Sequence, residues 1–523
     1  MKTTKLFFMA ALALMTAACS NDDNDILAPA EQPANNMITI TAKLAPKSGS
    51  AQTRTLSDQT TYIKAEWAQN EQLKIISDNG YPATANIDAV DGSGTATISF
   101  TIDAAAKGNN CTIIYPASAA VITESASVYT AQPMTAQTGT LSDNLDVRIG
   151  KGTITDEATP QLEVTTQPEA QFAIMKLTLA NNAKNLCIMA GDTTIAGATL
   201  GTEGTEFTVA VPAVSSKKVT IVANDESNNC YYFSKASVTI AAGKYYQSTL
   251  TSTSMPKLGT ESSADVYKMT EAGTIPDGKT VVLSGVTISG DQIACSGDAT
   301  IILMGSNSVS AADNTAAIKI GGSGTTLTIT GSGSLTATGG KNGAGIGTGY
   351  ANDASVAGGN IEINGGTITA TGGQSSAAIG TGSANTNGSI SNTCGTITIN
   401  GGSVTATGGT SGAGIGTAFA WGSSNECGAI TINGGTVTAT GGKNGAGIGT
   451  GSATNGSNTC GTITISTGVT SVTATMGKNS PNSIGKGYAK NGDTQTCGTI
   501  TIGGDATTYA AGVTTSPFTY PAS

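Results

Sequence analysis

The sequence predicts an all-β protein in which an N-terminal β-sandwich region precedes a right-handed parallel β-helix. The chain of 523 residues has 69 glycines but only 11% charged and 4% aromatic residues, unlike an ordinary helical domain. Alternating Thr, Val and Ile segments in the first half indicate antiparallel strands. The second half repeats at intervals of 33 to 37 residues, which indicates a solenoid.

The N-terminus has the pattern of an export signal. Two lysines precede the apolar run 6–18, and Cys19 follows two alanines, so the segment resembles a lipoprotein signal in which residues 1–18 are removed and Cys19 is lipidated. Thr16 stands where leucine is usual, which leaves cleavage by an ordinary signal peptidase as the alternative. Residues 19–36 are interpreted as a flexible tether. An acidic pair after the cysteine resembles a surface-export signal, so we expect a lipid-anchored, surface-exposed location on the outer membrane.

Residues 37–254 are predicted to form the β-sandwich region. Short stretches alternate between apolar residues and threonine or other polar residues, and turn-forming Gly, Asn and Asp interrupt them. No amphipathic helix is expected here. Several short strands at this spacing favour one or two small β-sandwiches. The clearest strand segments are 37–42, 95–102, 174–179 and 219–222.

Four motifs give this region a resemblance to the fimbrillin-like family, the subunits and accessory proteins of type V pili. They are residues 67–75, the Tyr-Pro pair 115–116, and residues 172–177 and 242–246. Glu71 stands where the family has a Gly-Asp pair. The resemblance implies proteolysis after an arginine, which removes a strand and opens a groove for a donor strand from another subunit. Arg54 matches that position, and a solvated loop arginine is the alternative.

Residues 262–523 carry the predicted β-helix. Each unit contains an Ile-Thr-Ile-like core, a Val-Thr-Ala strand and a Gly-rich strand, and a polar loop of about ten residues closes the turn. Inward aliphatic residues would stack from coil to coil at about 4.8 Å, with threonines outside. About eight coils are expected. The cores begin at residues 327, 361, 397, 430, 463 and 500.

Two sets of polar or sulfur-bearing residues recur in register. Asparagines that follow three of the cores are expected to form an internal amide ladder, which Ser466 interrupts. Four cysteines, each three residues before a core, should form a vertical row, with stacked free thiols favoured over disulfides. Zinc is excluded because four ligands in a line cannot form a tetrahedron. The ladder residues are Asn364, Asn400 and Asn433, and the row is Cys394, Cys427, Cys460 and Cys497.

Composition argues against several classes of function. There is no histidine, which excludes His-dependent catalysis and His metal ligands. Two arginines and a net charge of −10 make nucleic acid an unsuitable partner. Acids after residue 260 are scattered singly, so we expect neither an enzyme nor a cofactor or metal. Trp421 and Tyr350, in loops between coils, are candidates for stacking on a sugar ring.

The expected function is that of a surface lipoprotein acting as an adhesin or as a pilus accessory or tip subunit, with the β-helix as a display and binding rod. The alternative is a carbohydrate-binding protein that captures polysaccharide at the cell surface. A carbohydrate-active enzyme is a third hypothesis. The expected partners are the outer membrane through the lipid anchor, other fimbrial subunits through donor-strand addition, and host or dietary glycans.

Overall fold

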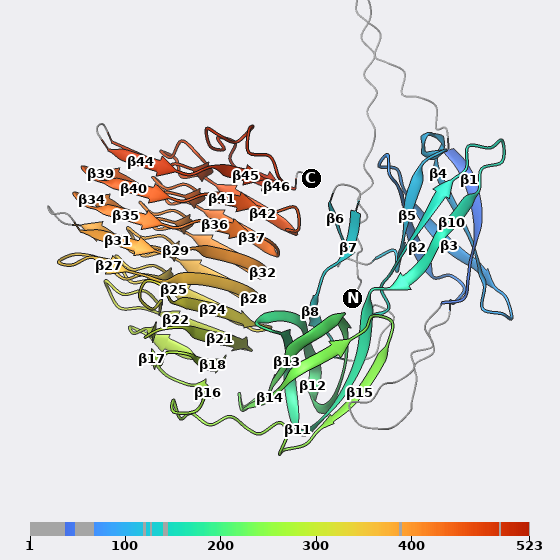
Figure 1. The fold of residues 1–523 in the computed structure, drawn as a ribbon, viewed down its shortest axis with the longest axis horizontal. Coiled ribbons are helices and arrows are strands. Elements are labelled where there is room, and N and C mark those ends of the chain that lie inside the picture. The colour runs from blue at the N-terminus through green and yellow to red at the C-terminus, as the bar shows by residue number, and fades with distance from the viewer. Residues whose placement is uncertain are drawn as a thin grey trace, which may run out of the picture.

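The computed structural model describes residues 37–47, 67–118, 122–125, 128–139, 145–385, 390–490 and 493–521. The chain is all-β, as predicted, with two largely antiparallel sheets followed by a long rod of parallel strands (Figure 1). A 3₁₀ turn, Ala104–Ala106, interrupts the strands of the first sheet. None of the described helical segments has the length and apolar character needed to cross a membrane. Cys19 and Arg54 lie outside the described residues.

The first sheet curves until its two edge strands, β1 and β10, come into contact, which gives a half-barrel. Apolar and polar residues alternate along β1, so one face of the strand packs into the core. Ile40 and Leu44 are fully buried, while Thr41 and Lys43 are exposed. In sheet order the strands are β1 (Met37–Leu44), β4 (Ala96–Asp103), β3 (Pro82–Val90), β2 (Gln72–Ser77), β5 (Asn110–Tyr115), β9 (Arg148–Ile154) and β10 (Leu162–Ala170). A separate hairpin consists of β6 (Ile122–Ser125) and β7 (Val128–Ala131).

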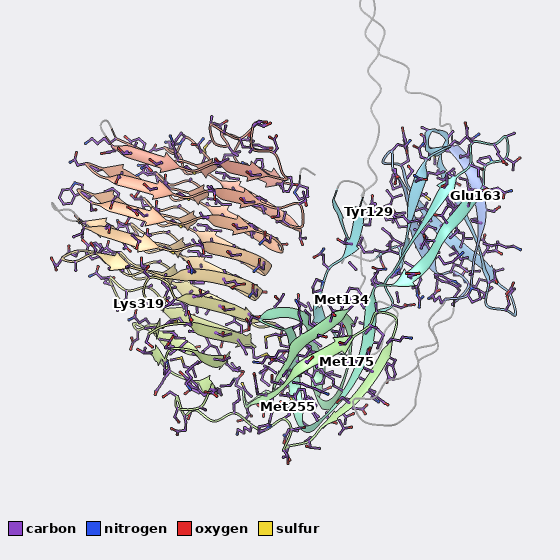
Figure 2. The ribbon with its side chains drawn as sticks, viewed as in Figure 1. Tyr129, Met134, Glu163, Met175, Met255 and Lys319 are labelled. Carbon is purple, nitrogen blue, oxygen red and sulfur yellow. The ribbon has the colours of Figure 1, made fainter. Side chains whose placement is uncertain are left out.

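The second sheet is built around two long strands and lies against the first coils of the rod (Figure 1). Its sequence alternates less regularly because parts of both faces are covered. Met175 and Met255 are buried in it, whereas Lys319 lies at an exposed edge of the rod (Figure 2). Its strands are β14 (Cys230–Ile240), β13 (Val214–Asn224), β11 (Phe172–Ala190), β12 (Thr193–Pro212) and β8 (Met134–Gln137), with β15 (Tyr245–Leu250) paired to β11.

The rod consists of stacks in which each strand pairs in parallel with its counterpart in the next coil. The core stack carries the Ile-Thr-Ile segments and buries their first and third residues. It comprises β16 (Val266–Met269), β18 (Lys279–Ser284), β21 (Ala299–Met304), β24 (Thr326–Gly331), β28 (Asn360–Thr371), β32 (Ile397–Thr407), β36 (Ile430–Ile432), β41 (Ile463–Ile465) and β45 (Ile500–Ile502).

Two further stacks complete the predicted three-strand unit. The threonine stack comprises β19 (Thr287–Ser289), β22 (Ser306–Ser310), β25 (Ser334–Thr338), the second halves of β28 and β32, β37 (Thr436–Thr440) and β42 (Ser471–Thr475), with β46 (Phe518–Tyr520) antiparallel at its end. The glycine stack comprises β17 (Gly273–Ile275), β20 (Ile293–Cys295), β23 (Ile318–Lys319), β26 (Ile346–Gly347), β29 (Ile379–Gly380), β33 (Ile415–Gly416), β38 (Ile448–Gly449) and β43 (Ile484–Gly485).

The segment expected to be a polar loop contains two more stacks, which corrects the three-strand description. The cysteine stack comprises β27 (Val356–Ala357), β31 (Ser391–Cys394), β35 (Ser424–Cys427), β40 (Ser457–Cys460) and β44 (Thr494–Cys497). The edge stack comprises β30 (Ala384–Asn385), β34 (Ala420–Trp421) and β39 (Ala453–Thr454). Polar sequences form strands here because every second residue is a small or amide side chain that fits inside the coil.

A buried junction joins the second sheet to the rod. Val282 and Ile302 point out of the core stack and are nonetheless almost completely buried, packed in one cluster with Val222 and its neighbours from the second sheet. One coil further on, the hydroxyl oxygens of Thr330 and Thr194 lie 2.9 Å apart, and the main-chain N–H of Gly331 donates to the Thr194 hydroxyl at 2.9 Å. Apolar packing and buried hydrogen bonds therefore hold these two parts together.

Candidate functional site

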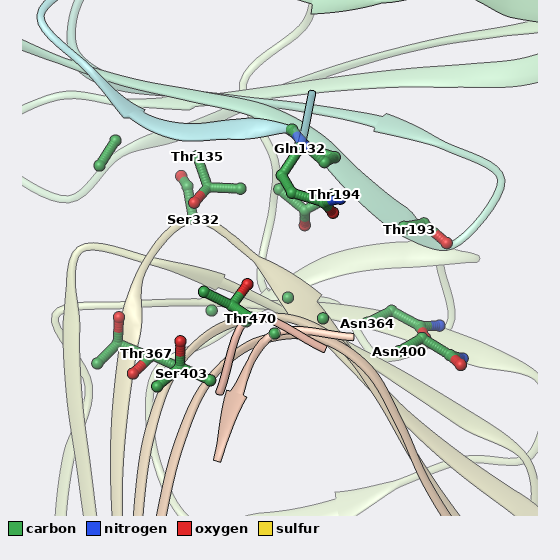
Figure 3. A pocket seen from close by; sticks show the side chains of 18 residues that line it. Gln132, Thr135, Thr193, Thr194, Ser332, Asn364, Thr367, Asn400, Ser403 and Thr470 are labelled. Carbon is green, nitrogen blue, oxygen red and sulfur yellow. The ribbon is translucent and has the colours of Figure 1, made fainter. Parts of the chain in front are cut away.

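A cavity of about 330 Å³ lies at the far end of this junction (Figure 3). One wall is the segment 132–136, which includes most of β8, together with Thr193 and Thr194 at the start of β12. The other wall is the rod, where Asn364 and Asn400 lie beside the Gly-Gly turns that follow them. Residues from the ranges 132–194 and 332–470, which are far apart in sequence, therefore form one cavity.

The cavity offers hydrogen bonding but no acid–base chemistry. Its lining consists of hydroxyl and amide side chains, the main chain of glycines, one proline and one alanine. None of these lining groups titrates near neutral pH or acts as a metal-binding carboxylate. Hydroxyl-rich ligands and water are the chemical classes that such a surface can hold.

The ladder of Asn364, Asn400 and Asn433 lies on the outer side of the core stack, whereas an internal ladder was predicted. The Asn400 amide donates to Oδ1 of Asn364 at 2.9 Å, and the Asn433 amide donates to Oδ1 of Asn400 at 2.9 Å. Asn364 is buried beside the second sheet, but Asn433 is exposed. Ser466 continues the ladder, because its hydroxyl donates to Oδ1 of Asn433 at 2.9 Å. A hydroxyl can replace the amide here since only one donor is needed.

Amides that do lie inside the rod were missed by sequence reasoning. Asn392, Asn425 and Asn458 pair from coil to coil in the cysteine stack and are fully buried. The Asn392 amide donates to the carbonyl oxygens of Gly349 and Gly382, and its own oxygen accepts from the Thr348 hydroxyl at 2.7 Å. Their signal is visible in the sequence, because each asparagine stands two residues before a row cysteine.

The cysteine row forms part of the rod interior. Cys394, Cys427, Cys460 and Cys497 pair in sequence from one coil to the next and are unbonded to one another as disulfides. The first three are buried and Cys497 is partly exposed. Sulfur–sulfur hydrogen bonds and burial raise the pKa of Cys427. Hydrogen bonds from Cys427 and Cys497 lower the pKa of Cys460 in the same row. Because Cys394, Cys427 and Cys460 are all buried, the row acts as packing inside the coil.

The predicted sugar-stacking residues lie on the edge of the rod that is remote from the second sheet, where β34 and β39 are labelled (Figure 1). Trp421 is 39% exposed at the end of β34. Tyr350 is partly exposed, and its hydroxyl donates to Oδ1 of Asn352 at 3.1 Å. Ala351 and Ala420, which adjoin these aromatics, pair in turn with Ala384, so the two aromatics belong to one edge, two coils apart.

Comparison with known proteins agrees with this architecture. Residues 327–350, 361–383, 397–419 and 430–452 each match the family described as Beta helix repeat. The rod is a parallel β-helix. Each matched segment runs from a core-stack strand to the beginning of the edge stack, so the match covers the repeating coils of the β-helix. No curated protein matches the chain.

A compact charged cluster marks the place where the segment containing Arg54 leaves the described structure. The Lys47 ammonium lies 3.9 Å from the ring centre of Tyr115 and 4.5 Å from that of Trp67. It also pairs with Asp146 at 3.3 Å and with Glu71 at 3.6 Å. Burial lowers the pKa of Lys47, and the two carboxylates oppose that shift. Glu71, the departure from the fimbrillin-like pattern, thus has a structural partner.

The Trp67 indole N–H donates to the carbonyl oxygen of Ala45 at 2.9 Å, so these two described residues, on either side of 48–66 in sequence, lie close together. Within the described ranges, no group of three or more Cys, Asp or Glu side chains is arranged to bind a metal ion. The candidate surfaces are therefore the junction cavity and the aromatic edge of the β-helix.

Proposed function

We propose that this chain is a surface-anchored adhesin or pilus accessory subunit in which the β-helix is a rigid rod that presents a binding edge. The observation that carries the proposal is the buried junction, which fixes the β-helix to the second sheet. A domain joined only by an exposed linker would move freely, whereas a buried apolar contact with internal hydrogen bonds restricts that motion. The edge stack, with Trp421 in β34, lies on the side of the rod remote from the second sheet (Figure 1).

The proposal includes a lipid anchor at Cys19, which would hold the protein at the outer membrane with the β-helix outside the cell. Residues 19–36 would act as the tether between the lipid and the first sheet. A solenoid suits the display role because each coil contacts only its neighbours, so length is added without a new core.

Assembly by donor-strand addition is supported by the fimbrillin-like resemblance and by the position of β1. This strand is an edge strand that buries Ile40 and Leu44 and pairs along its length with β4. Cleavage after Arg54 would leave β1 bound through these contacts and through the Lys47 cluster. A donor strand would therefore have to displace β1 before it could occupy the groove.

Four measurements on the full chain test this function. Cells that display the wild-type protein should adhere to a glycan- or matrix-coated surface. Cells that produce the Cys19→Ala variant should release it into the medium, because it lacks the lipid anchor. Multimers that persist on gels after mild heating should appear if subunits assemble. An N-terminal sequence beginning at Thr55 would support processing, whereas a surface protein beginning at residue 19 without multimers or adhesion would contradict the proposal.

Capture of polysaccharide at the cell surface is the second candidate, and the exposed aromatic edge favours it. Such a protein would bind soluble polysaccharide saturably without forming multimers. Neither candidate includes a catalytic step, so release of sugar products from a bound polysaccharide would contradict both.

A further inference from the structure

One position of the edge stack carries an aromatic side chain in every second coil. Ala351, Ala384, Ala420, Ala453 and Ala489 pair in parallel from coil to coil. The residue before each alanine therefore belongs to a single column along the β-helix axis. In order, this aromatic column is Tyr350, Ser383, Phe419, Ser452 and Tyr488.

The spacing leaves the aromatic rings available to a ligand. Neighbouring coils are about 4.8 Å apart, so rings in every second coil are separated by about 10 Å. Aromatics in every coil would be close enough to stack on one another. Here Ser383 and Ser452, both 2% exposed, separate them, while Tyr488 is 38% exposed.

Trp421 enlarges the middle of this column. It lies two residues after Phe419, and Ala420 between them is fully buried, so both aromatics point to the outside of the same coil. Among the described residues, Trp421 and Tyr488 are two of the four most exposed large hydrophobic side chains, and both lie on this edge.

Polar side chains run alongside the aromatic column. The main-chain N–H groups of Tyr350, Phe419 and Tyr488 donate to the carbonyl oxygens of Asn314, Ser375 and Asn444 in the preceding coil, which sets the two columns next to each other. Amides of this second column also bond to one another, from Asn342 to Asn314 at 2.7 Å and from Asn479 to Asn444 at 2.8 Å.

Cations border the polar column. Lys341, Lys443 and Lys478 each precede one of its asparagines, and all three are exposed. Lys486 and Lys490 are exposed on either side of Tyr488. Two carboxylates lie beside these lysines, since Asp313 accepts from the main-chain N–H of Lys341 and Asp493 from that of Lys490. The five lysines outnumber these two carboxylates, so the edge keeps a local excess of positive charge on a chain with a net charge of −10. Such a local excess favours a ligand that carries carboxylates.

We propose that the aromatic column and its polar and cationic borders bind an extended, acidic β-linked polysaccharide that lies along the β-helix axis. In a flat β-1,4-linked chain every second ring presents the same face, and this repeat is close to two coil spacings. Alternate sugar rings would stack on Tyr350, Phe419 and Tyr488, amides would bond hydroxyls, and lysines would face carboxylates. The inference rests on the proposed binding role of the β-helix.

Affinity electrophoresis of the full chain tests the site. The probes are carboxymethyl cellulose, hydroxyethyl cellulose with the same backbone but no charge, and dextran sulfate with charge on an α-linked backbone. The wild-type protein should be retarded most by carboxymethyl cellulose. The Tyr350→Ala/Phe419→Ala/Tyr488→Ala variant should lose about tenfold in affinity for each ring removed.

A variant of unchanged composition tests the spacing itself. Phe419→Ser combined with Ser452→Phe keeps three aromatic residues but places them three coils and one coil apart. Affinity should fall as far as in a single-ring deletion or further. Tyr81→Ala, which removes a 36%-exposed tyrosine from the first sheet, is the matched control and should bind like wild type. Unchanged thermal unfolding establishes that each variant is folded.

Several outcomes would overturn the inference. These are wild-type affinity in the folded triple variant, equal retardation by dextran sulfate and carboxymethyl cellulose, or no retardation of the wild type by any probe. Binding to hydroxyethyl cellulose as strong as to carboxymethyl cellulose would contradict the acidic class. If cells that display the triple variant adhere as well as cells that display the wild type, the inference alone is overturned. If cells that display the wild-type protein neither adhere nor form multimers, the proposed function is overturned.

Discussion

At the scale of single residues, the buried thiols show how burial determines chemistry. Cys111, Cys187 and Cys295 lie in different parts of the chain, and burial raises the pKa of each from 9.0 to about 12. An apolar surrounding disfavours the charged thiolate, which is the nucleophilic form. These cysteines therefore behave as small apolar side chains in the folded protein.

The raised thiol pKa predicts a loss of stability in alkaline solution. Below pH 9 the thiols are protonated in both the folded and the unfolded state, so the buried thiols contribute their full stabilisation to the folded protein. Above pH 9, unfolded thiols ionise while the folded Cys187 thiol stays protonated up to about pH 12. The unfolded state then binds fewer protons, and each such thiol lowers the free energy of unfolding by about 1.4 kcal/mol per pH unit.

Urea unfolding at pH 8 and pH 10 measures this loss. Because tyrosines and lysines also titrate in this range, the comparison is between wild type and Cys187→Ala. The variant should be less stable at pH 8 and lose about 1.4 kcal/mol less than wild type on going to pH 10. If wild type and Cys187→Ala lose the same free energy of unfolding between pH 8 and pH 10, ionisation of Cys187 does not contribute to the alkaline loss of stability.

At the scale of elements, the glycine stack shows what lets coils close tightly. Gly416 has φ +131, a conformation that side-chain-bearing residues rarely adopt, and a Cβ there would overlap the carbonyl oxygen of Gly449 in the next coil. The same constraint recurs at Gly380 and Gly449. From β26 onward the second residue of this strand is therefore glycine, whereas β23 carries Lys319 at the paired position.

Gly416→Ala should destabilise the β-helix strongly. The unfavourable φ and the overlap with the next coil together predict a loss of about 3 kcal/mol or more in the free energy of unfolding. Gly322→Ala is the control, since a Cβ at Gly322 meets nothing within 4 Å. Thermal unfolding followed by circular dichroism should show a lower midpoint for Gly416→Ala alone, and similar midpoints would contradict the argument.

The repeating parts of these elements were predictable because the same residue returns in every coil. The Ile-Thr-Ile cores and the row cysteines recur at fixed offsets, and the structure places them in successive coils. The edge stack was not predicted, since strands of two residues are too short for an alternation to appear. The aromatic column was not recognised because serine occupies the same position in the coils between the aromatics. Its signal is in the sequence, since Tyr350, Phe419 and Tyr488 each stand four residues after a glycine-stack isoleucine.

At the scale of the whole molecule, the covering of one face by another part of the chain was the least predictable feature. Val282 pairs with Ile302 in the next coil, and Ile302 pairs with Thr330 in the coil after that. Later coils carry Asn364, Asn400 and Asn433 at this position. Apolar residues at these outward positions indicate that the first coils are covered, but a single sequence does not say by which strands. The second sheet supplies the cover, and the junction cavity begins where this cover ends.

Val282→Asp should separate the β-helix from the second sheet while leaving the coils folded. The side chain is fully buried at the junction, and a carboxylate there would lose its hydration. This predicts a loss of about 3 kcal/mol or more of contact free energy, even though Lys268 is its neighbour in β16, because desolvation of a buried ion pair outweighs its attraction. Thr431→Asp is the control, because Thr431 also points outward from the core stack but lies beyond the cover and is partly exposed. Lys257, exposed in the segment between the two parts, reports the separation.

Limited trypsin digestion measures this separation through the rate of cleavage after Lys257, identified by mass spectrometry. Val282→Asp should be cut at least tenfold faster than wild type, because an open junction exposes the segment that the closed form holds against β14. Thr431→Asp should be cut at the wild-type rate. If Val282→Asp is folded and cut no faster than wild type, the junction does not hold the two parts together, and the β-helix would need another source of rigidity to act as a display rod.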